Sequence, residues 1–326
     1  MENKPQCRYV SPDGHTCSEI DMGSGFCFWH DNKFDKSGLE LTHKLERYAK
    51  RGGLLHGLEL KRVNLEGLNL INIDKNVGYD LSYSNFYRAN LRGAHLFNNT
   101  IRHASLMKAD LREANLHCTD LKDTNLLGIK LDNTRIDNID LGHALIQEKH
   151  GKSAKEQGNL AESLDMYQQS EEIYRILRKG AEQQGLFEMA GNYLYRELQM
   201  RHEQYPVGSK KWLFSSFSDF FCGYGEKPEN VIRFSLGMIF FCALCYFMLG
   251  VSFQSEIIVF DAAQTWQHNL NALLNSFYFS VVTFTTLGYG DITPVGVSRF
   301  IAAVEAFTGS FTLALFVVVF VKRMTR

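Results

Sequence analysis

The chain has 326 residues, 45% of them hydrophobic and 22% charged, with a formal net charge of -1. This near balance argues against nucleic-acid binding as the main role of the protein. The count of 5 prolines and the high apolar content exclude a proline-rich linker and a largely disordered chain. One contrast stands out, because no Lys or Arg occurs between Arg233 and Arg299. We expect that stretch to lie in lipid.

Residues 1–35 contain a cluster of soft metal ligands with the spacing C-x9-C-x9-C-x2-H. The four side chains are Cys7, Cys17, Cys27 and His30. Such a set in a short, glycine-containing segment with few aliphatic residues predicts a structural, tetrahedral Zn2+ site. His15 could replace one of the four ligands, and the alternative is a small loop with reduced, buried thiols. The arrangement resembles a short Cys3His module of some plant transcription factors, which implies zinc but not DNA binding here.

The first thirty residues carry charged side chains and thiols where a signal peptide has an apolar core. We therefore expect no signal peptide and a cytoplasmic N-terminus. Residues 36–57 are expected to form a linker helix.

A period of five residues governs residues 58–145. Large apolar residues recur at this step: Leu81, Phe86, Leu91, Leu96, Ile101, Leu106, Leu111, Leu116, Leu121, Leu126, Leu131, Ile136 and Leu141. A small or β-branched residue stands two places before most of them, for example Ala89, Ala109 and Thr119. One large and one small inward position in every five residues predicts one side of a four-sided solenoid. Leu60, Leu65 and Leu70 are one residue out of phase, which predicts an insertion near 74–78.

Units such as Ala109-Asp110-Leu111 and Ala114-Asn115-Leu116 resemble pentapeptide repeats. The resemblance implies a right-handed quadrilateral β-helix. Some members of that family mimic DNA with a strongly acidic surface, whereas acidic and basic residues are nearly equal in number here. A rigid spacer, or a docking surface for an unknown cytoplasmic ligand or protein, is therefore the expected role.

Two further segments connect the solenoid to the C-terminal region. Residues 153–205 show apolar spacing of three and four, which predicts a helical hairpin that caps the solenoid or packs on neighbouring subunits. Residues 210–228 combine Lys210 and Lys211 with several aromatic residues. This pattern favours a helix lying in the membrane interface, and a buried linker is the alternative.

Residues 231–326 are expected to form an all-α pore domain with two membrane spans, 234–253 and 297–321. Each is long enough to cross the hydrocarbon core of a bilayer, which is about 30 Å thick. Basic residues lie at the outer flank of each span, so the positive-inside rule places both termini in the cytoplasm of a cell-membrane protein.

The stretch between the spans contains Thr286-Leu287-Gly288-Tyr289-Gly290-Asp291. It resembles the selectivity filter of potassium channels, preceded by a pore helix at 270–285. A filter must point successive carbonyls at one axis, which requires positive φ at alternate residues, and Gly288 and Gly290 supply it. The resemblance implies that Tyr289 packs on the pore helix, that Asp291 lies at the outer mouth, and that Leu287 replaces the commoner valine without loss of potassium preference.

One filter strand cannot surround an ion, so the resemblance implies a homotetramer. Gly309 is a candidate gating hinge, and close helix packing is the alternative role for a glycine there. Glu305, ionisable at membrane depth, is expected to face the protein interior and to support the filter.

The sequence thus predicts a potassium-selective, homotetrameric, non-enzymatic channel that conducts K+ and is gated through its cytoplasmic N-terminal region. Two alternatives remain: a membrane-anchored interaction scaffold, and a cation channel without potassium selectivity.

Overall fold

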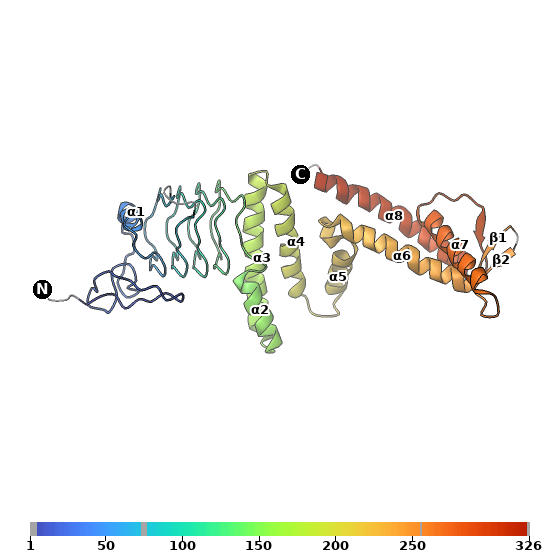
Figure 1. Ribbon diagram of the computed structural model, residues 1–326, viewed down its shortest axis with the longest axis horizontal. Coiled ribbons are helices and arrows are strands. Elements are labelled where there is room, and N and C mark those ends of the chain that lie inside the picture. Colours follow the sequence, from blue (N-terminus) through green and yellow to red (C-terminus); the bar gives the residue numbers. More distant parts are fainter. Residues whose placement is uncertain (1–4, 73–76, 255, 325–326) are drawn as a thin grey trace. The chain divides into compact units, whose positions relative to one another are not determined.

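The structure is a computed structural model that describes residues 5–72, 77–254 and 256–324. It forms two compact units, Met1–Val207 and Gly208–Arg326, which we describe separately. The first unit contains the helices α1 (Thr42–Lys50), α2 (Ile146–Glu156), α3 (Leu160–Gln183) and α4 (Phe187–Glu203). Between α1 and α2 the chain winds into stacked coils (Figure 1).

The coils form a solenoid built from isolated parallel bridges, one every five residues on successive coils. Asn90 pairs with Asp110, and Asp110 with Lys130, so a complete coil takes 20 residues and has four sides. The predicted inward residues are buried, from Leu81 at 0% exposure to Leu131 at 5%, except that Leu141 is only partly buried. The period of five is therefore confirmed as the determinant of the core.

Threonine takes the small inward position in several coils without leaving an unpaired hydroxyl. Thr119 donates to the carbonyl oxygen of Leu96 at 3.0 Å, and Thr134 donates to that of Leu111 at 2.6 Å. A buried hydroxyl without a partner would cost free energy, so these bonds let threonine replace alanine in the core.

The first coil is longer than the others. Asn64 pairs with Asn90, a separation of 26 residues, which accommodates the out-of-phase Leu60, Leu65 and Leu70. The insertion was predicted near 74–78, and residues 74–76 of this range lie outside the described part of the chain.

Helices cover the last coil. The Gln184 amide donates to the carbonyl oxygen of Gly180 and accepts from the backbone N–H of Ile136, and Arg196 donates to the carbonyl oxygen of His143. Gly180 packs on Ile136 and Leu131. Helices α3 and α4 lie within the predicted hairpin at 153–205 and pack on each other, and the sequence prediction missed α2, which precedes them. The predicted linker helix 36–57 is also shorter, since α1 comprises only Thr42–Lys50.

The second unit contains α5 (Lys210–Cys222), the short helix η1 (Gly223–Gly225), α6 (Pro228–Leu249), α7 (Trp266–Phe284) and α8 (Ser298–Met324). The interfacial helix was predicted at 210–228, but α5 ends at Cys222, because Gly223 caps it in the left-handed conformation at φ 55°. The predicted span 234–253 ends too late, since Gly250 terminates α6 and residues 251–253 form a strand. The pore helix begins at Trp266 rather than at 270.

A small sheet follows α6, with strand order β2-β1-β3. β1 (Val251–Phe253) pairs antiparallel with β2 (Glu256–Ile258) and with β3 (Ile292–Pro294). The Ser298 hydroxyl, at the start of α8, donates to the carbonyl oxygen of Gly250 at 2.8 Å. These contacts connect the segment after the filter to the end of α6.

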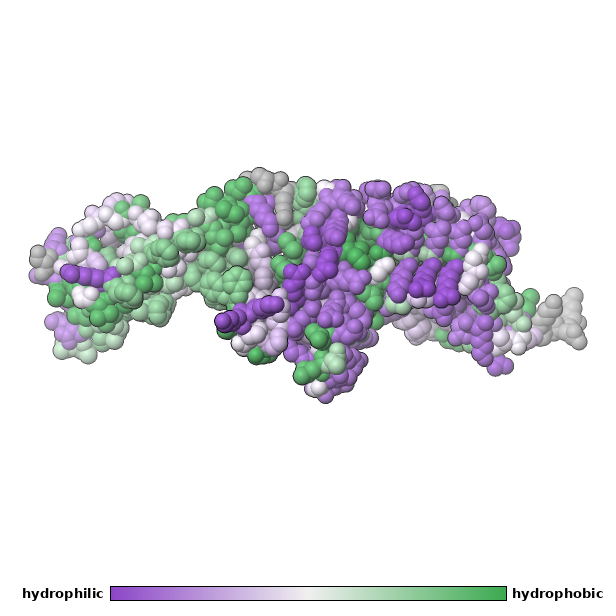
Figure 2. Space-filling view, turned by 180° about the vertical axis from the view of Figure 1, so that it is seen from behind, coloured by the Kyte–Doolittle hydropathy of each residue, from purple (hydrophilic) through white to green (hydrophobic). Residues whose placement is uncertain are grey.

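Two helices, Pro228–Leu249 and Ser298–Lys322, are long and apolar enough to cross a membrane. Large apolar side chains on both are exposed, among them Phe240 at 58%, Phe300 at 73% and Phe311 at 68%. Hydrophobic colour covers most of the visible surface of this unit in Figure 2. A surface of this kind requires lipid or other subunits to cover it.

Candidate functional site: filter and metal cluster

The filter strand begins where the pore helix ends. The backbone N–H of Thr286 donates to the carbonyl oxygen of Thr283, and that of Leu287 donates to that of Val282, both at 3.0 Å. Beyond these bonds φ is positive at alternate residues, 57° at Thr286, 57° at Gly288 and 78° at Gly290. Positive φ at a β-branched residue is unfavourable, and such strain concentrates at functional sites.

This alternation is the geometry that brings successive carbonyls to one side of a strand. Among the described residues, none donates a backbone hydrogen bond to the carbonyl oxygens of Thr286, Leu287, Gly288 or Tyr289. Because backbone carbonyls in proteins are normally hydrogen-bonded, these four oxygens are available for another partner, such as a cation.

The side chains of Leu287 and Tyr289 are exposed in the single chain, at 59% and 67%. The expected packing of Tyr289 on the pore helix stays a prediction, since two thirds of this residue is exposed in one chain. An uncovered leucine and tyrosine within the filter are explained if neighbouring chains pack against them.

Asp291 is held by the pore helix through a contact that sequence reasoning missed. The Tyr278 hydroxyl donates to Asp291 Oδ2 at 3.0 Å, so the last residue of the filter is bonded to α7. The two residues are thirteen apart, a separation that matches neither the helix period nor the strand period, so nothing in the sequence indicated this hydrogen bond.

Glu305 lies in a buried cluster contributed by three helices, consistent with its expected position. Its carboxylate is 1% exposed, and its Oε2 accepts a bond from the Tyr246 hydroxyl of α6 at 2.6 Å. Its Oε1 lies 2.5 Å from the hydroxyl of Ser280 on the pore helix, and that hydroxyl also lies 2.8 Å from the carbonyl oxygen of Ile239. The three side chains connect both spans to the pore helix.

Gly309 lies one turn beyond Glu305 on α8 and against the end of the pore helix. A Cβ at Gly309 would stand 2.0 Å from the carbonyl oxygen of Phe284. This contact corresponds to the alternative role, close helix packing. The gating hinge stays a prediction.

The four predicted metal ligands converge in the N-terminal module. Ligand atoms of Cys7, Cys17, Cys27 and His30 all lie within 4.8 Å of one another, and all four residues are buried. Cys17 Sγ lies 3.8 Å from Cys27 Sγ, and His30 Nδ1 lies 3.2 Å from Cys27 Sγ and 3.7 Å from Cys7 Sγ. Zn–S and Zn–N bonds of about 2.3 and 2.0 Å at tetrahedral angles give edges of about 3.5 to 3.8 Å, so this donor set fits zinc.

His15 is not part of this group, and its ring instead lies edge-on to that of His56, with centroids 6.1 Å apart.

The contacts of His30 also suit a metal ligand. Its Nε2 lies 2.8 Å from the carbonyl oxygen of His56, which fixes the proton on Nε2 and leaves the Nδ1 lone pair facing the thiols.

Burial lowers the pKa of His30 to about 4 and raises the pKa of the Cys27 thiol to about 12. The imidazole is therefore neutral at pH 7, as metal ligation requires. The charge of a bound divalent cation would favour the thiolate form of the cysteines.

Comparison with known proteins assigns both parts of the chain. Residues 234–326 match the ion channel family, and residues 80–112 and 109–145 match pentapeptide repeats. Over 92 residues the chain is 33% identical to potassium voltage-gated channel subfamily A member 5 of Mustela putorius furo. Over 87 residues it is 32% identical to protein LctB of Bacillus caldotenax.

Each match covers only part of this chain and only part of the relative. They cover 28% and 27% of this chain, and the chain spans 14% of the channel subunit and 64% of LctB. A pentapeptide repeat protein of Cyanothece aligns with 32% of this chain and 96% of its own, at 23% identity and a TM-score of 0.20. The family matches and the coil geometry together show a pentapeptide-repeat domain followed by a two-span, potassium-channel-type pore domain.

Proposed function

We propose that the protein is a membrane channel that conducts K+ passively and selectively through Thr286–Asp291. The observation that carries the proposal is the alternation of positive φ at Thr286, Gly288 and Gly290 within the sequence TLGYGD. Backbone carbonyls facing one axis can replace the hydration shell of a potassium ion.

The conducting form is a homotetramer. One chain supplies one filter strand, and a ring of carbonyls around an ion requires several copies. The exposure of Leu287 and Tyr289 beside the filter supports this assembly. The remaining apolar faces of α6 and α8 contact lipid.

The C-terminal end of α7 points its carbonyls, and hence the negative end of its dipole, toward the conduction path, where a cation is favoured. Both termini lie in the cytoplasm in this proposal, which the basic residues at the outer flanks of the spans support. The N-terminal unit then lies on the cytoplasmic side, where it can act on the gate.

We also propose that Cys7, Cys17, Cys27 and His30 bind one Zn2+. Four protein ligands close the coordination sphere, so the ion would cross-link the module and leave no position for a substrate. The convergence of the four ligand atoms supports this assignment.

The test is ion flux into liposomes that contain purified full-length protein, with K+ or Na+ as the permeant ion. We expect K+ flux well above Na+ flux, and loss of K+ flux in Gly290→Ala, since φ of 78° disfavours a Cβ. Gly208→Ala is a matched control, because Gly208 has φ of 81° but lies outside the pore elements. Equal K+ and Na+ flux would indicate a non-selective channel, and intact tetramers without flux would favour a scaffold.

A further inference from the structure

Three basic residues stack on one corner of the solenoid. The backbone N–H of Arg62 donates to Tyr87, that of Arg88 to Met107 and that of Lys108 to Leu127, so the three occupy equivalent places on successive coils. All three have left-handed backbone, with φ of 55°, 55° and 58°, and all three are exposed. We call Arg62, Arg88 and Lys108 the basic column.

Five other basic residues of the solenoid form ion pairs, whereas the basic column forms none within the described residues. Ion pairs join Arg92 to Glu113, Arg102 to Asp120, Arg112 to Asp110, Lys122 to Asp140 and Arg135 to Asp137. None of the three column residues forms an ion pair with any residue in the described ranges.

Acidic side chains near the column have other partners, and Asp35, which is close to Arg62, accepts from the backbone N–H of Ser37 at 2.9 Å. Glu59 pairs with Lys61 at 3.3 Å, and Asp110 faces Arg112 at 2.5 Å. Successive coils are about 4.8 Å apart, so the column places three like charges within about 10 Å. Like charges at this spacing repel one another, and an anion alongside them would relieve the repulsion.

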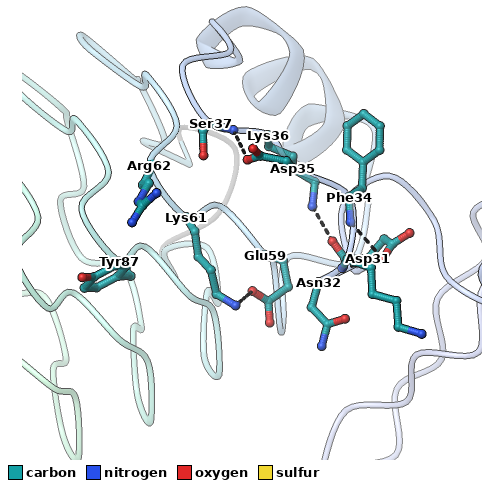
Figure 3. A pocket seen from close by; sticks show the side chains of 11 residues that line it. Asp31, Asn32, Phe34, Asp35, Lys36, Ser37, Glu59, Lys61, Arg62 and Tyr87 are labelled. Atoms are coloured by element: carbon teal, nitrogen blue, oxygen red, sulfur yellow. Dashed lines mark hydrogen bonds and ion pairs between the residues drawn. The ribbon is translucent and has the colours of Figure 1, made fainter.

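A pocket of about 330 Å³ adjoins the first residue of the column. Arg62, Lys61 and Tyr87 line one side of it, and the segment from Asp31 to Ser37 lines the other (Figure 3). Arg88 lies over the Tyr87 ring, 5.3 Å from its centroid, which joins the pocket to the column.

The segment opposite the column adds a buried cation and two carboxylates, Asp31 and Asp35, each of which accepts a hydrogen bond from a backbone N–H. Lys36 is 3% exposed and donates to the carbonyl oxygen of Asp31 at 2.7 Å. The Asp31 carboxylate accepts from the Ser24 hydroxyl at 2.6 Å and from the backbone N–H of Lys33 at 2.8 Å. These bonds limit the repulsion that Asp31 would exert on an anion.

We propose that this surface binds a multiply phosphorylated small molecule, such as a nucleoside triphosphate. Its phosphate chain would lie along the basic column, and its remaining part would occupy the pocket against Tyr87. Three phosphates match three basic side chains in number, and guanidinium groups bind phosphate oxygens in pairs. The site does not depend on the proposed ion conduction.

The test is isothermal titration calorimetry of the full-length protein in detergent, with tripolyphosphate and with ATP as probes. We expect both to bind, more weakly as salt rises. Arg62→Gln/Arg88→Gln/Lys108→Gln should lose at least about tenfold in affinity for both. The control Arg92→Gln/Arg112→Gln/Arg135→Gln removes the same charge from ion-paired positions and should lose less than about twofold. Size-exclusion profiles and circular dichroism spectra establish that each variant is folded.

A second variant separates the pocket from the column. Tyr87→Ala should weaken ATP binding more than tripolyphosphate binding, because only ATP has a part that occupies the pocket, although both lose the ring beneath Arg88. Equal losses in the two triple variants would show only general charge attraction and would overturn the proposal, as would the absence of binding to the native protein. Unchanged ATP affinity in Tyr87→Ala would overturn the assignment of the pocket.

Discussion

Gly309 of α8 packs against the carbonyl oxygen of Phe284, the last residue of the pore helix. A Cβ there would stand 2.0 Å from that oxygen and 2.8 Å from its carbon. Since Phe284 is followed closely by Thr286, where the filter begins, this contact positions α8 against the base of the filter.

Gly309→Ala should therefore destabilise the pore domain by about 1–3 kcal/mol, because the methyl group forces α8 away from backbone atoms that cannot move easily. Thermal melting of the detergent-solubilised protein and K+ flux measure the effect. Gly237→Ala in α6 is the matched control, since its Cβ would meet nothing within 4 Å. Equal stability of the two variants would contradict the packing role.

A second prediction concerns the buried cluster around Glu305. Tyr246→Phe keeps the ring but removes the hydroxyl that donates to Glu305 at 2.6 Å, and should cost about 1–3 kcal/mol of stability. Ser280→Ala removes the other contact. A double-mutant cycle over both sites should give a coupling energy above about 0.5 kcal/mol, because both hydroxyls contact one carboxylate. Strict additivity would show that they act independently.

Zinc content tests the metal cluster directly. We expect one zinc per chain by elemental analysis, and loss of zinc in Cys27→Ser. Removal of the metal should lower the stability of the N-terminal unit by more than about 2 kcal/mol, or about 4–8 °C in Tm. Cys118→Ser is the control, because Cys118 lies on the solenoid outside the cluster. Zinc retained in Cys27→Ser would refute the assignment.

Acid should destabilise the solenoid through its ion pairs. The side chain of Arg112 lowers the pKa of Asp110, and that of Arg135 lowers the pKa of Asp137. A lowered folded-state pKa contributes stability above the unfolded value, about 3.9, and this contribution is lost as the pH falls below it. The pairs are partly exposed, so we expect a total of about 1 kcal/mol.

The contribution of these two ion pairs is measured by comparing the Tm of the double variant Asp110→Asn/Asp137→Asn with that of the native protein. Its Tm should be below that of the native protein at pH 6, and the difference should shrink by pH 3. A difference that stays constant over this range would mean that the two carboxylates contribute no pH-dependent stability.

Lys322 near the end of α8 pairs with Glu226, which stands between η1 and α6. The end of the second span is thus tied to the connection that leads from the N-terminal unit. If that connection acts on the gate, Glu226→Lys should change the open probability in planar bilayers, and Glu226→Lys/Lys322→Glu should restore it. Lack of rescue by the reversed pair would argue against this contact as part of gating.

Sequence alone predicted the repetitive and the motif-based parts of this protein. The recurrence of a large apolar residue every five positions identified the inward residues from Leu81 to Ile136. This was possible because every coil places the same positions of its repeats in the core. The candidate filter and the four candidate metal ligands could be proposed from the sequence because their chemistry fixes residue type and spacing over short distances, and the structure shows the alternating positive φ and the convergence of the four ligand atoms. Helix α2 was missed because its sequence is polar and has few apolar residues to reveal a period.

The contacts between distant segments could not be predicted. The bonds from Tyr278 to Asp291 and from Tyr246 to Glu305 join helices whose relative rotation no local pattern encodes. The end of α6 at Leu249 depends on pairing between β1 and β3, since residues 251–253 are apolar enough to continue a span. The unpaired basic column became visible only when the coils were stacked in register.

The most direct test of the central claim is the reversal potential of purified protein in a planar bilayer with K+ on one side and Na+ on the other. A potassium-selective filter predicts a large shift toward the potassium equilibrium potential, and no current in Gly290→Ala. A reversal potential near zero would show that Thr286–Asp291 does not select potassium, and would contradict the account.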